Sequence, residues 1–190
     1  MKSLNCKKQT KKCISLLSAG ALLLSALAGS FSVSATDAVI NVKDYSSLAT
    51  DDNWTPAIQK AIDTAAETGA AVYIPSGEYP CEPAEEKESW EVTPATFYLP
   101  DAAVTIMGDG EETVLYKPRN ASVTENSAAM FRTSYKSSAK ITIKDIKIRG
   151  NNNPGSNFGL IDGIVLNGSS NATVENVSVD GTKRHGIYMI

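Results

Sequence analysis

Acidic, basic and imidazole side chains gather in one part of the sequence, shortly before its end. Carboxyl groups, cations and imidazoles are the groups that donate, accept or stabilise protons in general acid–base catalysis. We therefore select five of these residues as candidate catalytic residues. They are Asp162, Asp180, Lys183, Arg184 and His185.

Repeated strand patterns would position these side chains. The segment from Thr142 to Gly150 aligns without gaps with the segment from Thr173 to Gly181, at a shift of 31. In both segments the alternation of apolar residues breaks once, at Asp145 and at Asn176, and both residue types tolerate the left-handed conformation of a sharp bend. Each segment is therefore predicted to be two short strands joined by a one-residue corner, with Ile143 and Ile146 facing inward.

Two other spacings indicate how long each repeat is. The segment from Gly163 to Leu166 reappears as Gly186 to Met189 at a shift of 23, and Val72 to Pro75 reappears as Phe97 to Pro100 at a shift of 25. Short β-branched strands with a period in the low twenties indicate a parallel β-solenoid, in which coils stack about 4.8 Å apart. A β-sandwich is the main alternative, but it would require hairpin turns between its strands.

One amphipathic helix precedes the strands. Apolar residues recur at helical spacing from Trp54 to Ala66, which gives the helix one apolar face. Thr55 is predicted to be its N-cap, Pro56 its first residue and Gly69 its left-handed end.

The helix and the strand after it carry a family resemblance that extends over nearly all of residues 38 to 190. The chain resembles the pectin-lyase-like right-handed parallel β-helices, and within them the rhamnogalacturonase/epimerase-like pectate lyase group. This resemblance implies an all-β fold, a single-stranded right-handed parallel β-helix with an N-terminal capping α-helix. The matching segments are Val42 to Tyr45, Asp51-Asp52, Ala57 to Ile62 and Val72 to Tyr79, whereas Ser46 to Thr50 replaces the expected glycine-rich turn.

The resemblance also implies a groove beside one stack of strands, and two chemistries that the candidate residues could perform there. A uronide lyase would use Lys183 or Arg184 as its base, with Ca²⁺ neutralising the substrate carboxylate. An inverting hydrolase would use Asp162, Asp180 and His185. The segment Arg184 to Ile187 is similar to the Gly-His-Gly-Ile of polygalacturonases, with Arg184 in place of the first glycine. No metal site is predicted from the residues themselves.

Substrate binding would draw on residues near this groove. Trp90 lies in an acidic loop between Pro80 and Pro94, where it either stacks on a sugar ring or belongs to a solvated excursion. The candidate substrate-binding residues are Asn151, Asn152, Asn153 and Trp90.

The expected function is that of a carbohydrate-active enzyme that cleaves an acidic, pectin-like polysaccharide by elimination or by hydrolysis. A non-catalytic glycan-binding or adhesive β-helix is the alternative, and a structural spacer is a third. With no basic stripe in the sequence, a nucleic-acid partner is not expected. A monomer is expected for the full-length protein.

The first 35 residues are predicted to be an export signal. Five lysines precede an apolar run from Ile14 to Ala28, and Val33-Ser34-Ala35 supplies small residues for cleavage. The apolar run is short for a membrane span. The protein is therefore expected to be secreted and free of the membrane after cleavage.

The remaining chain, residues 36 to 190, is predicted to hold the cap and the first coils. It carries 13 basic against 21 acidic residues, a formal charge of −8, and Cys81 as its only cysteine. Because stacked coils require a capping end, the sequence is expected to continue in a longer protein.

Overall fold

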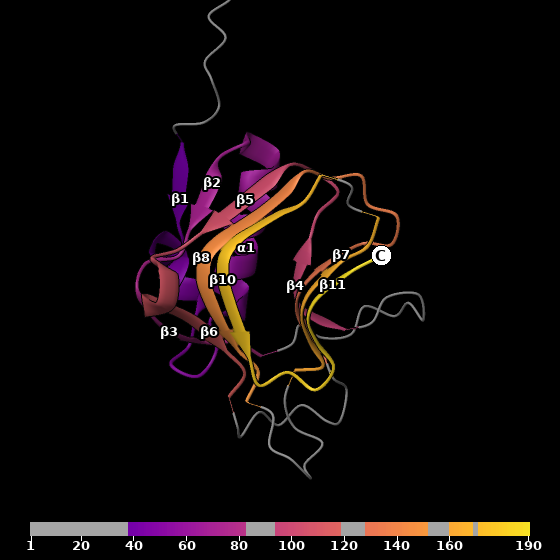
Figure 1. Cartoon of the computed structure of the whole chain (residues 1–190). Coiled ribbons are helices and arrows are strands. Elements are labelled where there is room, and N and C mark those ends of the chain that lie inside the picture. Colours follow the sequence, from indigo (N-terminus) through magenta and orange to yellow (C-terminus); the bar gives the residue numbers. More distant parts are fainter. Residues whose placement is uncertain (1–37, 83–93, 119–127, 152–159, 169–170) are drawn as a thin grey trace, which may run out of the picture. The chain divides into compact units, whose positions relative to one another are not determined.

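The computed structural model describes residues 38–82, 94–118, 128–151, 160–168 and 171–190. The described residues belong to one compact unit, which is mostly β-structure with few helices (Figure 1). The elements in chain order are β1 (Val39–Asn41), η1 (Val42–Leu48), α1 (Thr55–Thr68), β2 (Ala71–Tyr73), β3 (Gly77–Pro80), β4 (Ala95–Leu99), β5 (Val104–Met107), η2 (Gly110–Glu112), β6 (Thr113–Tyr116), β7 (Ala129–Thr133), β8 (Ile141–Arg149), β9 (Asp162–Leu166), β10 (Thr173–Asp180) and β11 (His185–Met189).

The strands form two sheets, and every strand pair in them is parallel. The larger sheet has the order β1-β2-β5-β8-β6-β3, with β10 also paired to β8, and the smaller sheet has the order β11-β9-β7-β4. In Figure 1 the long curved strands β8 and β10 lie side by side, opposite the group formed by β4, β7 and β11. The prediction of a mostly-β fold with parallel strands is therefore confirmed.

The predicted one-residue corners are present in β8 and β10. Asp145 and Asn176 have φ values of 56° and 48°, in the left-handed region. Strand pairing is interrupted between these two residues and resumes at Ile146 and Val177. The amide of Asn176 donates a hydrogen bond to Oδ1 of Asp145 at 2.8 Å. The residues flanking the corner, Ile143 and Ile146, are both buried, as the sequence predicted.

Of the three sequence spacings, two are confirmed and one is wrong. Thr173 pairs with Thr142, and Ile187 pairs with Ile164, at the predicted separations. Val72, however, pairs with Ile106 in the larger sheet, whereas Phe97 pairs with Phe131 in the smaller sheet. The third spacing therefore relates strands of different sheets. Both sequence segments are apolar and end in a proline, and this local similarity does not indicate which sheet a strand joins.

Helix α1 begins one residue earlier than predicted and ends where expected. Trp54 occupies the N-cap position without a side-chain cap bond, so the prediction of Thr55 as N-cap is wrong. Oδ1 of Asn53 instead accepts a hydrogen bond from the backbone N of Thr55 at 2.9 Å. Gly69 follows the last turn with a φ of 76° and donates its backbone N–H to the carbonyl of Ala65.

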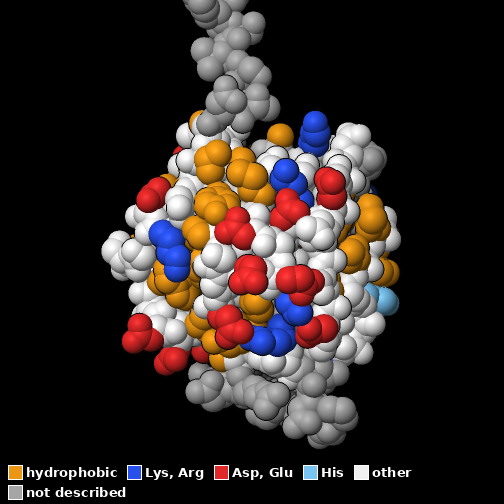
Figure 2. All heavy atoms as spheres, turned by 60° about the vertical axis from the view of Figure 1, so that its left-hand side comes forward, with side chains coloured by type: hydrophobic (Ala, Val, Ile, Leu, Met, Phe, Trp, Pro, Cys, Tyr) orange, Lys and Arg blue, Asp and Glu red, His pale blue; other side chains and the backbone are white. Residues whose placement is uncertain are grey.

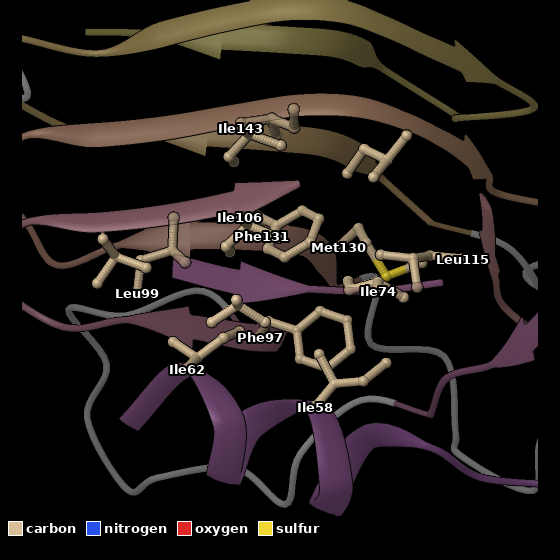
Figure 3. Close-up of a cluster of buried hydrophobic side chains, with 14 of the residues drawn as sticks. Ile58, Ile62, Ile74, Phe97, Leu99, Ile106, Leu115, Met130, Phe131 and Ile143 are labelled. Carbon is tan, nitrogen blue, oxygen red and sulfur yellow. The ribbon is translucent and has the colours of Figure 1, made fainter. Parts of the chain in front are cut away.

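One face of α1 packs against the core between the sheets. In Figure 3, Ile58 and Ile62 point from the helix toward Phe97, and all three side chains are fully buried. The Phe97 and Phe131 rings lie 5.1 Å apart. The core therefore extends from the helix through the smaller sheet, as the apolar stripe of the helix predicted.

A polar contact ties α1 to the free edge of the smaller sheet. Oε1 of Gln59 accepts from the backbone N of Tyr98 at 3.0 Å, and Nε2 donates to the carbonyl of Tyr98 at 3.0 Å. Strand β4 is the last strand of that sheet, so these bonds satisfy backbone groups that an edge strand would leave unpaired. None of the helices in the described part of the chain is long and apolar enough to cross a bilayer.

The outer side of the larger sheet carries charges of both signs. Figure 2 shows acidic and basic side chains interspersed on this side of the molecule. Lys147 pairs with Glu111 at 2.7 Å and Arg149 pairs with Glu78 at 3.0 Å, with both glutamates largely exposed. Because charges of both signs are interspersed among its described residues, this side offers no concentrated field of one sign to a charged ligand.

Candidate functional site

The strands of the smaller sheet bend near their beginning. Met130 and Phe131 are consecutive in β7, yet both are fully buried in the core (Figure 3). In β9, a Cβ on Gly163 would lie 2.6 Å from Cγ1 of Val179, which packs against the core, and the next residue, Ile164, belongs to the core as well. Two consecutive side chains thus face inward, which a straight strand does not allow.

The bend brings residues three apart in sequence onto the outer face of the smaller sheet. The hydroxyl of Tyr98 accepts a hydrogen bond from the backbone N of Ala95 at 3.3 Å. The rings of His185 and Tyr188 stack with centroids 4.6 Å apart and 10° between their planes. We define the outer face by two rows of residues in register across the four strands. The first row is Ala95, Ala129, Asp162 and His185, and the second is Tyr98, Arg132, Val165 and Tyr188.

Asp162 is the centre of the contacts on this face. Its Oδ1 and Oδ2 accept from Nε and Nη2 of Arg184 at 3.1 and 2.6 Å. Oδ1 also accepts from the backbone N of His185 at 3.2 Å and lies 2.9 Å from Nδ1 of the imidazole. The Asp162 side chain is only 1% exposed, whereas those of Arg184 and His185 are 52% and 39% exposed. A buried carboxylate thus holds two solvent-accessible groups in place.

The hydrogen bonds determine the charge state of Asp162. Burial raises its pKa and is the largest single effect, but the bonds from Arg184 and His185 together outweigh it and hold the pKa below its usual range. Asp162 in turn raises the pKa of Arg184 through the same hydrogen bonds. The pair is therefore ionised at neutral pH, and Asp162 cannot serve there as a proton donor.

The ionised carboxylate also fixes the tautomer of His185. A carboxylate only accepts hydrogen bonds, so the proton of a neutral imidazole at this position lies on Nδ1. Nε2 then carries the lone pair, and it has no hydrogen-bond partner within the described residues. Stacking on Tyr188 fixes the plane of the ring. Asp162 and Tyr188 together present Nε2 as a proton acceptor on the outer face.

The remaining sequence-predicted site residues lie elsewhere. Asp180 ends β10 and pairs in register with Arg149 of the larger sheet. The backbone N of Lys183 donates to the carbonyl of Leu160 at 2.9 Å. No contact among the described residues joins the Asp180 or Lys183 side chain to Asp162, so the structure groups only Asp162, Arg184 and His185.

The predicted binding residues do not join this group either. Asn151 has a left-handed φ of 54°, and its amide donates a hydrogen bond to the carbonyl of Lys117. It therefore stabilises the turn after β8. Asn152, Asn153 and Trp90 lie outside the described residues.

Sequence reasoning missed two members of the outer face, Arg132 and Tyr188. Arg132 lies in β7 among buried neighbours. Tyr188 lies in β11, and the centroid of its ring is 5.9 Å from Cζ of Arg184. The sequence signal for Arg132 is an arginine inside an otherwise apolar strand. The bend of the strand decides which side chains face outward, and the alternation of residues does not reveal this bend.

The residue types at this site fit a cation only poorly. In the parts of the chain that the structure describes, no three His, Cys, Asp or Glu side chains come together as a metal site. Both carboxylate oxygens of Asp162 already accept hydrogen bonds from Arg184. Among the described residues, the outer face therefore has no set of side chains that could bind the Ca²⁺ of a lyase.

Comparisons with known proteins identify the family of the chain. The family model described as rhamnogalacturonase A/epimerase, pectate lyase-like matches residues 39–134, just over half of the sequence. No curated protein matches the chain. Asp162, Arg184 and His185 follow the matched segment, so their roles rest on the geometry of this structure.

One solved structure with a weak likeness is the crystal structure of the Agl-KA catalytic domain. The likeness covers 80% of this chain and 34% of that chain, with 16% sequence identity and a TM-score of 0.35. This chain thus spans about a third of that structure, and the likeness is too weak to support an argument. By the match of the family model, the chain belongs to the rhamnogalacturonase A/epimerase, pectate lyase-like family.

Proposed function

We propose that this protein is a carbohydrate-active enzyme that cleaves a uronate-containing polysaccharide by β-elimination on the outer face of the smaller sheet. The family supports a polysaccharide substrate. The observation that carries the choice of reaction is the hydrogen bond between Asp162 and Nδ1 of His185, which leaves Nε2 of this partly exposed side chain as the base. His185 replaces Lys183 and Arg184, the bases that the sequence suggested for a lyase.

The reaction requires a base, a stabiliser of negative charge and a leaving group. Nε2 of His185 accepts the proton from C5 of the uronate ring, and the electrons of that C–H bond become the C4=C5 double bond. The C4–O bond to the next sugar breaks, and the released oxygen takes a proton from water. Arg184, half-exposed beside the imidazole, stabilises the negative charge that develops on the uronate carboxylate.

Elimination fits the charge states better than hydrolysis does. An inverting hydrolase needs one carboxylic acid and one carboxylate on opposite sides of the scissile bond. Asp162 is ionised and already accepts hydrogen bonds from two residues, while Asp180 pairs with the larger sheet. Among the described residues of the outer face, Asp162 is the only carboxylate, so the pair that hydrolysis requires is not assembled there.

Non-catalytic glycan binding is the second candidate function. The stacked rings of His185 and Tyr188 form an aromatic pair on the outer face, and such rings bind sugars through apolar contact without further chemistry. This candidate would retain binding to the same polysaccharide but release no product.

The wider organisation of the protein is part of the proposal. The parallel strands would belong to a single right-handed β-helix, with α1 as its N-terminal cap. Residues 1–35 would act as an export signal, so that the mature protein acts outside the cell. N-terminal sequencing of protein recovered from the culture medium of the source organism tests export, and we expect the mature chain to begin near Thr36. A chain that still begins at Met1 would contradict export.

The experiment that tests the reaction is incubation of the protein with polygalacturonate, with and without calcium. We expect ultraviolet absorbance from the new C4=C5 double bond to rise together with reducing ends. Reducing ends without that absorbance would indicate hydrolysis and overturn the proposed elimination. Binding without either product would favour the second candidate, and neither binding nor product with a panel of acidic glycans would overturn both.

A further inference from the structure

Arg132 occupies the middle of the outer face and has an incomplete set of partners. It pairs in register with Tyr98 of β4 and Val165 of β9. Its Nη1 is buried and has no hydrogen-bond partner, one of two such side-chain atoms in the described residues. A buried donor of a charged group without an acceptor is unfavourable and uncommon in folded proteins.

The charges around Arg132 do not neutralise it. Asp162 interacts with it electrostatically, but both Asp162 oxygens are engaged by Arg184 and His185. The strand positions that define the outer face, together with Arg184, thus hold two guanidinium groups against one carboxylate. The chain as a whole has a formal charge of −3. An excess of positive charge at this one place in an acidic protein attracts an anion.

The neighbours of Arg132 in the second row supply no carboxylate. Val165, next to it in β9, is apolar and buried, and the rings of Tyr98 and Tyr188 lie at the two ends of the same row. Neighbouring strands are about 4.8 Å apart, so side chains at neighbouring positions of this row lie within the length of one sugar residue. A planar guanidinium matches a carboxylate in a two-bond geometry.

We propose that Arg132 is a specificity-determining residue that binds the carboxylate of a uronate unit lying across the outer face. This inference rests on the proposed function, because it assigns the acidic group of the same substrate. The carboxylate would supply a further acceptor to a guanidinium whose partners within the described residues are incomplete. Arg184, which remains engaged with Asp162, stabilises the negative charge that develops during the reaction, whereas Arg132 would bind the substrate carboxylate before the reaction begins.

Calorimetric binding measurements test this assignment without requiring turnover. The ligands are trigalacturonate and its carboxyl-reduced counterpart, a neutral trisaccharide of the same linkage. We expect wild-type protein to prefer the acid, and Arg132→Gln to lose about tenfold or more of its affinity for the acid with little change for the neutral sugar. Arg132→Lys, which keeps the charge but not the planar fork, is expected to fall between the two.

Arg149→Gln is the matched control. Arg149 is an arginine in the larger sheet, paired with Glu78, and its replacement should leave the preference for the acid unchanged. Circular dichroism and thermal melting establish that each variant is folded; if Arg132→Gln is unfolded, the test is decided by Arg132→Lys.

The outcomes separate this inference from the proposed function. If wild-type protein binds and cleaves polygalacturonate but the Arg132 variants keep the full preference for the acid, the assignment of Arg132 is wrong and the proposed function stands. If wild-type protein binds the neutral sugar as well as the acid, carboxylate recognition is wrong. If wild-type protein neither binds nor cleaves the acidic polymer, the proposed function fails together with the inference.

Discussion

Asp162 and His185 are joined across neighbouring strands of the smaller sheet, with Oδ1 of Asp162 2.9 Å from Nδ1 of the imidazole. The two residues pair in register at the first positions of β9 and β11. A bend in these strands directs both side chains outward, and the buried carboxylate fixes which ring nitrogen is available to a substrate. The proposed chemistry depends on this pair.

The stability of the protein should depend on pH through Asp162. Its pKa is lowered in the folded state, so its contribution is present above the unfolded pKa of about 3.9 and is lost as pH falls through the folded pKa. We expect the wild type to have a higher melting temperature than Asp162→Asn at pH 7. This difference in melting temperature should shrink below a pH of about 4. Thermal melting across this range measures it. A difference that does not change with pH would contradict the ionised pair.

Removing Arg184 should destabilise the fold by leaving a buried carboxylate with fewer donors. Arg184 bonds Asp162 through two nitrogens, while Asp162 itself is 1% exposed. Because Arg184 is half-exposed, we expect Arg184→Ala to lower the free energy of unfolding by about 1–2 kcal/mol, toward the lower end for hydrogen bonds to charged groups. Urea denaturation measures this loss, with Arg149→Ala as the control for an exposed ion pair, which should lose less.

The bend in β9 predicts different outcomes for alanine at two glycines in neighbouring strands of the smaller sheet. A Cβ on Gly163 would lie 2.4 Å from the carbonyl oxygen of Gly186, whereas a Cβ on Gly186 would meet nothing closer than 3.7 Å. We therefore expect Gly163→Ala to lose about 1–3 kcal/mol of stability through overpacking and Gly186→Ala to change little. Equal losses in chemical denaturation would show that the strand does not bend as described.

The corner of β10 predicts that glycine is better tolerated than alanine at position 176. Asn176 has a left-handed φ and bonds Asp145. Asn176→Ala would lose the bond and adopt a strained backbone, at a cost of about 1–2 kcal/mol, whereas Asn176→Gly would lose only the bond. Equilibrium unfolding of the two variants decides this, and an alanine variant as stable as the glycine variant would argue against the left-handed corner.

Much of the fold could be predicted from sequence because its repeats place like residues in like positions. Thr142 and Thr173 align in sequence and pair in the structure, and the break at Asp145 marks the corner. The pairing of Val72 could not be predicted in this way. Its partner Ile106 lies beyond a strand of the other sheet, and local composition does not distinguish the sheets.

The candidate site was only partly predictable for a related reason. Arg184 and His185 are adjacent in sequence, and Asp162 lies one repeat earlier, so the repeat that relates β9 to β11 placed them together. The outward position of Arg132, by contrast, depends on two consecutive inward side chains in β7. Residue alternation, which assumes a straight strand, could not reveal this position.

The role of His185 as the base is tested most directly by comparing the wild type with His185→Ala on polygalacturonate and following the ultraviolet absorbance of the unsaturated product. We expect the wild type to form this product and the variant to lose about 10²–10⁴-fold in rate, the contribution of a positioned general base. Both proteins should bind the polymer, and Arg149→Gln should react like the wild type. A His185→Ala variant that forms the unsaturated product at the wild-type rate would contradict the role of His185 as the base.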